Sequence, residues 1–163
     1  MKDTVFWLSE EQLSRLVETY RVGDGPCKRE QIDCLLYPFT DHVHRYAEGG
    51  GGLFSTPQDI IKFYQMLAHH GVYQGKRILS EEAIQTLATK QTPDDIDFGY
   101  SLGLWVKGNW VWHGGAQQTE GVANLKTGEA RVYMVQLVGT PDPEIRKKVD
   151  QIINSWSLEP LDK

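Results

Sequence analysis

The chain has 163 residues, 40% hydrophobic and 24% charged, which suits one soluble globular domain or a large part of a bigger one. Its 17 basic and 22 acidic residues give a net charge of −5, which argues against a nucleic-acid partner. No run approaches the ~20 apolar residues that cross a bilayer, so no membrane partner is expected either.

The N-terminal stretch and the two cysteines give no sign of export or of metal binding. "MKDTVFWLSEEQ" lacks the uninterrupted apolar core of a signal peptide, so the chain as written is expected to be cytoplasmic, or the mature piece of an exported protein. Cys27 and Cys34 stand apart in a loop-like stretch and fit neither a disulfide framework nor a metal knuckle. No cofactor is expected.

The first element predicted is a helix followed by a long connection. Ser9 and Gln12 form a capping box, and apolar residues continue at helical spacing to Tyr20, which predicts a helix of roughly three turns. From Arg21 to Gly52 the pattern dissolves into Gly, Pro, Asp and Cys. This stretch is predicted to be a long loop, and long loops inside compact domains are often functional.

Two further helices are predicted before residue 93. Thr56 caps a helix that has Pro57 in its first turn and ends at Gly71. Ser80 caps the next helix, which carries Ile84 and Leu87 inward.

After Pro93 the apolar pattern changes from helical to extended. "YSLGLWV", "WVWHGG", "EGVANLK" and "ARVYMVQLVG" are β-branched and aromatic runs separated by turn signals. The short connections predict neighbouring antiparallel strands. A last helix begins around Pro141 to Glu144, and one apolar face of it is expected to cover the sheet. That face consists of Ile145, Val149, Ile152, Ile153 and Trp156.

This order of elements predicts an α+β fold: an antiparallel sheet of about three to four strands with flanking helices and a C-terminal helix packed on the sheet. Residues 1–163 are predicted to form a single, incomplete domain. It comprises a helix plus long loop (1–52), a helical segment (53–92), antiparallel strands (98–140) and the C-terminal helix (141–158).

The stretch "VWHGGAQQTEG" holds the strongest candidate for chemistry. His113 follows a strand of large residues, and Gly114 and Gly115 leave the backbone open to a ligand. Such a strand can donate an N–H to an oxygen that becomes negative. The alternative is that the two glycines make a bulge or a turn. The local sequence favours neither interpretation.

A second, weaker candidate is "DHVHRY". Asp41, His42 and His44 could bind a metal if a third ligand such as His69 or His70 lay over them. A His-x-His pair in a loop without a clear third partner is more often surface histidine, so no metal site is predicted.

Five stretches in this order resemble the C-terminal part of the serine β-lactamase and penicillin-binding-protein family, including its esterase-like members. They are "GGGGLFSTPQDIIKFYQML", "GKRILSEEAI", "YSLGLWV", "WHGGA" and "ANLKTGEARVYMVQLVG". "MKDTVFW" resembles the segment that follows the helical lobe in these proteins, so the resemblance spans Met1 to about Trp156. It implies a partial β-lactamase/transpeptidase-like fold.

The resemblance also implies roles for the candidate site. His113, Gly114 and Gly115 would occupy the family's Lys-Thr-Gly motif, which is His-x-Gly or His-Gly-Gly in esterase-like members. The Ala116 N–H would be one oxyanion-hole donor, and His113 would orient a substrate carboxylate or help relay a proton. A β-lactam, an ester or a peptide would each fit such a wall as substrate.

The chain departs from the family where the nucleophile should be. The family's nucleophile is the Ser of a Ser-x-x-Lys motif, activated by that Lys and by the Tyr of a Tyr-x-Asn motif. Tyr46-Ala47-Glu48, the nearest match to the tyrosine motif, ends in Glu. None of the serines has Lys three residues later: Ser9, Ser14, Ser55, Ser80, Ser101, Ser155 and Ser157.

We therefore expect a C-terminal portion of a serine hydrolase that is inactive alone, or a non-catalytic ligand- or partner-binding module that retains the pocket strand. A metal-assisted hydrolase at His42 and His44 is a third hypothesis. Without the family's first two strands, the strand around Val132–Val138 is expected to be an exposed edge. The expected partner is a second copy at this edge, or a missing N-terminal half.

Overall fold

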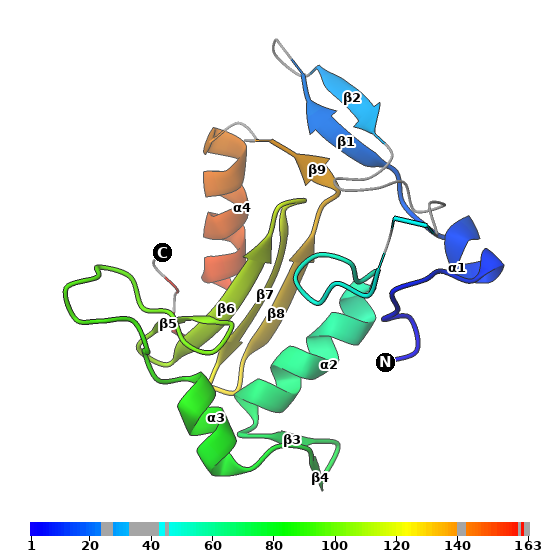
Figure 1. The fold of residues 1–163 in the computed structure, drawn as a ribbon. Helices are drawn as coiled ribbons and strands as arrows, with labels where there is room; N and C mark the ends of the chain where they lie inside the picture. The colour runs from blue at the N-terminus through cyan, green and yellow to red at the C-terminus, as the bar shows by residue number, and fades with distance from the viewer. Residues whose placement is uncertain (24–27, 33–42, 45, 140–142, 160, 162–163) are drawn as a thin grey trace.

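The computed structural model describes residues 1–163 apart from 24–27, 33–42, 45, 140–142, 160 and 162–163. It is an α+β fold, as the sequence predicts (Figure 1). The helices are α1 (Glu10–Ser14), α2 (Pro57–Ala68), α3 (Glu81–Leu87) and α4 (Pro143–Ser155). The strands are β1 (Thr19–Val22), β2 (Arg29–Ile32), β3 (Val72–Tyr73), β4 (Lys76–Arg77), β5 (Trp105–Lys107), β6 (Trp110–Gly115), β7 (Thr119–Asn124), β8 (Ala130–Met134) and β9 (Leu137–Val138).

The predicted antiparallel sheet is confirmed. It has four strands in the order β5-β6-β7-β8, joined by the short connections that the turn signals indicate. In the register of β6 and β7, Val111 lies opposite Ala123 and His113 lies opposite Gly121. Because side chains alternate along a strand, these four residues share one face of the sheet.

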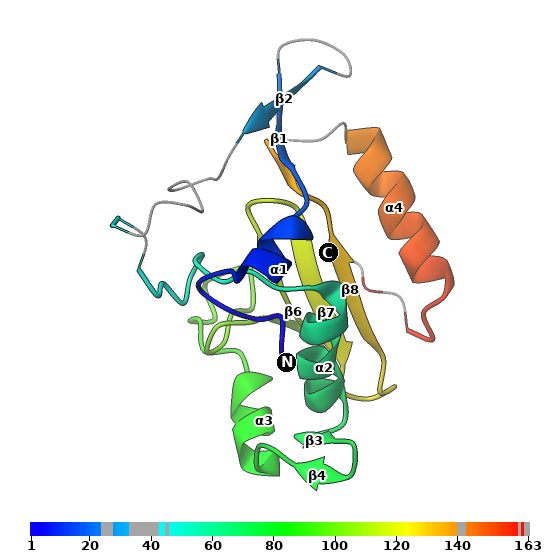
Figure 2. The same cartoon turned by 90° about the vertical axis from the view of Figure 1, so that its right-hand side faces the viewer.

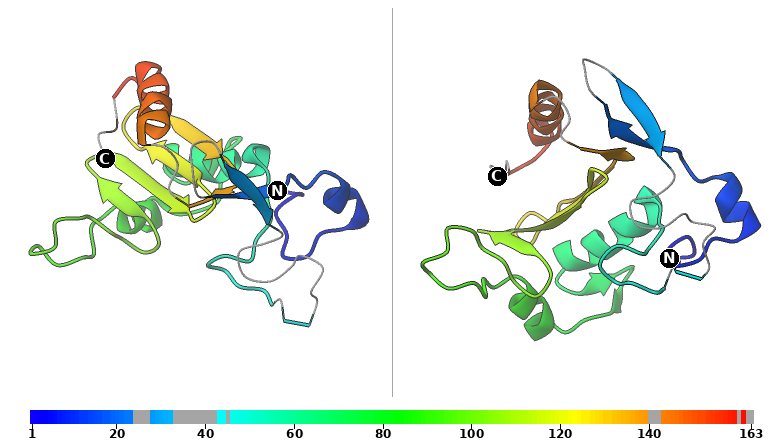
Figure 3. Two further views of the ribbon diagram at one scale, coloured as in Figure 1. Left: turned by 90° about the horizontal axis from the view of Figure 1, so that it is seen from above. Right: turned by 45° about the horizontal axis from the view of Figure 1, so that its top comes forward.

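Helix α2 packs on this face and α4 lies on the opposite one, so the sheet is the middle of three layers (Figures 2 and 3). The Tyr64 ring of α2 lies directly on Gly121: an added Cβ there would be only 1.7 Å from Tyr64 Cε2. Only glycine fits under the ring, so this contact fixes the distance between α2 and the sheet. The main core lies between α2, α3 and the sheet and contains Tyr64, Met66, Leu67, Ala68, Ile84, Leu104, Val106, Val111 and Ala123.

The start of α2 is as predicted, and it also holds the N-terminal segment in place. The Thr56 hydroxyl accepts from the Asp59 N–H, and Pro57 stands in the first turn. The buried Asp59 carboxylate bonds the Asp3 N–H at 2.7 Å and Lys62 Nζ at 2.6 Å. Together with hydrogen bonds between Val5 and Phe54, these contacts attach the first residues to α2.

The N-terminal prediction is right about where the first helix begins and wrong about how far it runs. The Ser9–Gln12 capping box is present, but α1 ends at Ser14. Residues 19–22, predicted as helix and loop, form β1, which pairs with β2 as an antiparallel hairpin inside the predicted loop. Leu13 and Val17 are exposed, so the helical pattern has no surface on which to pack.

The last predicted strand divides in two. β8 continues the main sheet, whereas β9 leaves it and pairs in parallel with β1, Tyr20 lying opposite Leu137. The prediction of one exposed edge from Val132 to Val138 is therefore wrong for its second part, which β1 covers. Among the described residues no strand pairs with the outer edge of β8.

Helix α4 is where the sequence predicts it, and polar side chains take part in its contacts with the sheet. Arg146 lies 3.3 Å from a Glu120 carboxylate oxygen, and its guanidinium is 5.8 Å from the Tyr133 ring centroid. Two residues of the predicted apolar face, Ile152 and Trp156, are 54% and 79% exposed. The prediction that this face covers the sheet is therefore wrong for at least these two residues. No helix in the described part of the chain is long and apolar enough to span a bilayer.

Candidate active site

The His-Gly-Gly stretch is regular strand. Each residue of β6 from Trp110 to Gly115 has a partner in β7, with Gly114 opposite Glu120 and Gly115 opposite Thr119. Neither glycine has a positive φ. The alternative interpretation of a bulge or turn is wrong, because the ladder is uninterrupted. The chain turns only after Gly115, at Ala116–Gln118.

The two glycines are needed to different degrees. A Cβ on Gly115 would lie 2.3 Å from Thr119 Oγ1, so packing against the neighbouring strand accounts for this glycine. A Cβ on Gly114 would meet only the Thr119 carbonyl oxygen, at an ordinary 3.6 Å. Packing therefore does not require glycine at position 114, and the backbone there is open to approach.

The His113 side chain is exposed, and one of its ring nitrogens has a partner. Nε2 lies 3.2 Å from the Tyr100 hydroxyl, and the two rings meet edge to face with centroids 6.2 Å apart. Tyr100 precedes β5 and forms a bridge with Trp105.

A second tyrosine lies under the same strand. Tyr64 is 6% exposed, and burial raises the pKa of its hydroxyl to about 12, opposed by a hydrogen bond with the backbone of His113. Its hydroxyl is therefore protonated at neutral pH. Since the ring also fills the space beside Gly121, Tyr64 supports the strand from below at the point where His113 stands.

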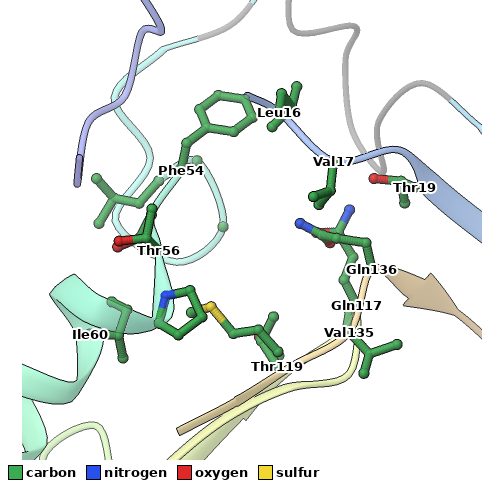
Figure 4. A pocket seen from close by; sticks show the side chains of 18 of the residues that line it. Leu16, Val17, Thr19, Phe54, Thr56, Ile60, Gln117, Thr119, Val135 and Gln136 are labelled. Atoms are coloured by element: carbon green, nitrogen blue, oxygen red, sulfur yellow. The ribbon is translucent and has the colours of Figure 1, made fainter. Parts of the chain in front are cut away.

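Beyond the end of β6 lies a cavity of about 1250 Å³ (Figure 4). Its walls come from the α1–β1 segment, the glycine run 49–52, the start of α2, and the residues that join β6 to β7 and β8 to β9. The backbone of Gly115 and Ala116 forms part of one wall. Ala116 lies at the cavity wall, whereas His113 is not among the residues that line the cavity and lies beside Tyr100.

The lining of the cavity is mixed. It includes the apolar side chains of Leu16, Val17 and Phe54 and the amide side chains of Gln117 and Gln136 (Figure 4). Gln136 Oε1 is buried and makes no hydrogen bond among the described residues. A buried amide oxygen without a donor is costly, and this oxygen has almost no surface that a molecule in the cavity could reach.

The structure brings together only some of the residues singled out in the sequence. Gly115 and Ala116 meet the cavity, whereas Tyr46 lies at its edge, largely exposed. Within the described residues no three His, Cys, Asp or Glu side chains gather as metal ligands, and His42 lies outside those residues. Sequence reasoning missed Tyr100 and Tyr64, since each reaches the strand from a segment remote from it in the chain.

Comparisons with known proteins agree with the architecture. The chain matches the family Beta-lactamase over residues 1–154. Protein Rv1367c of Mycobacterium tuberculosis is 30% identical over 95 residues, 58% of this chain and 23% of that protein. Simvastatin synthase (LovD) from Aspergillus terreus has a TM-score of 0.73 at 14% identity, covering 96% of this chain and 47% of its own. EstCE1, a hydrolase with promiscuous acyltransferase activity, has a TM-score of 0.64 at 15% identity, and the match covers 83% of this chain and 42% of EstCE1.

A sheet between two helical layers, with His-Gly-Gly on an inner strand and a cavity at that strand's end, defines a partial serine-β-lactamase-like fold. With a family match over residues 1–154, this chain belongs to the β-lactamase family. It spans under half the length of LovD and of EstCE1, and its match covers 23% of Rv1367c.

Proposed function

We propose that these residues form one wall of the acyl-transfer site of a β-lactamase-like serine hydrolase acting on a β-lactam, ester or peptide carbonyl. The single observation that carries this proposal is the uninterrupted His113–Gly115 strand that ends at the cavity. In this function the Ala116 N–H donates to the carbonyl oxygen as it becomes negative, and His113 orients the substrate.

The open backbone at Gly114 supports this role, because a substrate must approach the strand closely to receive its N–H groups. Family membership supports the reaction class. Acyl transfer in this class needs an activated serine, whose oxygen bonds the carbonyl carbon while the leaving group departs with a proton.

We further propose that residues 1–163 do not turn over substrate by themselves. None of the seven serines is followed three residues later by Lys, so the chain lacks the spacing that pairs the family's nucleophile with its base. In this proposal the nucleophile is supplied from outside these residues, by a missing N-terminal half.

A hydrolysis assay with a chromogenic cephalosporin and p-nitrophenyl acetate tests this proposal, using the purified chain and His113→Ala. We expect neither protein to exceed the buffer rate, and we expect a fluorophosphonate probe to leave the intact mass unchanged. Turnover that His113→Ala abolishes, or a probe adduct on any serine, would show that a nucleophile lies within the chain.

A second candidate function, a non-catalytic module that binds a ligand, is favoured by the cavity itself. The cavity is about 1250 Å³, and apolar side chains such as Leu16, Val17 and Phe54 line part of it, which suits a small molecule with an apolar body. Titration with a medium-chain aliphatic alcohol, followed by amide NMR, tests this function. Saturable shifts at Gly115, Ala116 and Gln136 are expected if it holds, and unchanged spectra would reject it.

As partner we propose a second copy of this chain at the outer edge of β8. Two β8 strands paired antiparallel about Val132 would place Arg131 of each copy opposite Tyr133 of the other, and Ala130 opposite Met134. This register sets no like charges against each other and lets an arginine meet an aromatic ring. Unpaired N–H and C=O groups along such an edge favour association.

A further inference from the structure

Tyr100 is held firmly in place beside the histidine of the proposed site. Its carbonyl accepts from the Gln91 and Thr92 N–H groups at 2.8 and 3.2 Å. Its ring packs edge to face on Trp105, with centroids 4.8 Å apart. Because backbone and ring are both fixed, the Tyr100 hydroxyl has a set position relative to β6.

That hydroxyl meets one nitrogen of His113 only. The Tyr100 Oη to His113 Nε2 distance of 3.2 Å lies at the outer end of the hydrogen-bond range. A neutral imidazole has one nitrogen that donates and one that accepts, so whichever role Nε2 takes, Nδ1 takes the other. A tyrosine beside Nε2 can therefore decide which nitrogen carries the proton.

We propose that Tyr100 is a positioning residue for His113: its O–H donates to Nε2 and leaves the proton of the neutral ring on Nδ1. A phenol O–H is a better donor than acceptor, which favours this direction. The hydrogen bond also limits rotation of an imidazole that is otherwise exposed.

The role of this hydrogen bond toward a substrate rests on the proposed function, in which His113 orients the substrate. With Nε2 engaged by Tyr100, the nitrogen left for a substrate carries N–H. His113 is then a hydrogen-bond donor that orients an acceptor, not a base that removes a proton. The matching substrate carries a carboxylate or a second carbonyl oxygen beside the reacting carbonyl.

The experiment is long-range ¹H–¹⁵N correlation NMR on the full chain labelled with ¹⁵N-histidine. It is done at about pH 8.5, about two units above the usual pKa of a histidine side chain. The missing signal in His113→Gln assigns the residue. In the wild-type chain we expect His113 Nε2 to be the bare nitrogen and Nδ1 the protonated one. In Tyr100→Phe, which keeps the ring packing, we expect this single tautomer to be lost.

Tyr73→Phe, in the β3–β4 hairpin, is the matched control and should leave the His113 signals unchanged. A protonated Nε2 in the wild-type chain would overturn the proposal without any variant. The same tautomer in wild type and Tyr100→Phe would also overturn it. Because these readouts need no turnover, they are separate from the hydrolysis assay, whose failure would overturn only the proposed function.

Discussion

Replacing Gly121 by alanine tests how the sheet supports the site. The added Cβ would lie 1.7, 2.3 and 2.4 Å from three carbons of the Tyr64 ring. Carbon atoms pack at about 3.5–4.0 Å, so the ring must move by about 2 Å. Tyr64 is 6% exposed and lies within the core, where such overpacking typically costs 1–3 kcal/mol. We expect a loss of about 3 kcal/mol in the free energy of unfolding, or about 6–12 °C in Tm.

Urea unfolding followed by tryptophan fluorescence measures this loss. Gly50→Ala is the control, because a Cβ there would meet nothing within 4 Å. Tyr64→Leu should remove the clash, so the double variant should be more stable than the sum of the single effects predicts. A Gly121→Ala loss no larger than that of Gly50→Ala would refute the claim that Tyr64 occupies this space.

Asp59→Asn should lower the free energy of unfolding by about 2 kcal/mol near neutral pH, since the buried carboxylate bonds Lys62. That bond holds the pKa of Asp59 below its usual value of 3.8. The stabilisation by the ionised carboxylate is therefore fully present above pH 3.8, and it is lost as the pH falls through the lower pKa of Asp59 in the folded protein. Urea titrations of both proteins should converge on acidification, and a constant gap would contradict this. Gly114→Ala should stabilise by about 0.5 kcal/mol. Gly115→Ala should not stabilise the protein, because its methyl would lie 2.3 Å from the Thr119 hydroxyl oxygen. Equal changes in the free energy of unfolding for Gly114→Ala and Gly115→Ala would refute this difference between the two glycines. The outer edge of β8 should gain hydrogen-exchange protection as concentration rises, together with a larger sedimentation coefficient, and a monomer at every concentration would exclude this edge as an interface.

Local signals in the sequence were enough to place most elements. Caps at Ser9, Thr56 and Ser80 mark where helices begin, because each hydroxyl satisfies an N–H of its own first turn. The strands of the main sheet follow from alternation and short turns, which also act within a few residues. Predictions of this kind succeed because the causes are neighbours in the chain.

The N-terminal error has a cause that lies far away in the chain. β1 forms because residues 20 and 21 pair with Leu137 and Val138, more than a hundred positions later. Nothing within residues 13–22 indicates that partner, and the apolar spacing there fits a helix equally well. For the same reason the sequence predicts too long an exposed edge: β9 is covered by β1, and no local pattern indicates this pairing.

The two tyrosines of the candidate site illustrate the same limit on the functional side. A search for a family tyrosine motif leads to Tyr46, which is exposed, whereas the hydroxyl beside His113 belongs to Tyr100. "YSLGLWV" indicates only extended structure, and the bridge to Trp105 that turns Tyr100 toward β6 is a tertiary feature. In the sequence Tyr64 is one more apolar residue of a helix pattern. Its contact with Gly121 becomes evident only in the structure, where the Tyr64 ring occupies the space that a Cβ on residue 121 would need.

The glycine pair after His113 shows what structure adds to an ambiguous motif. In the sequence Gly114 and Gly115 are equivalent, and both a turn and an open binding strand account for them. In the ladder they differ: a Cβ on Gly115 would clash with the Thr119 hydroxyl in its present rotamer, whereas Gly114 has ordinary space around it. Folding therefore accounts for one of the two glycines. The other is glycine at a position where alanine would fit, on the strand that leads to the cavity, and in the proposed function it keeps the backbone open to the substrate.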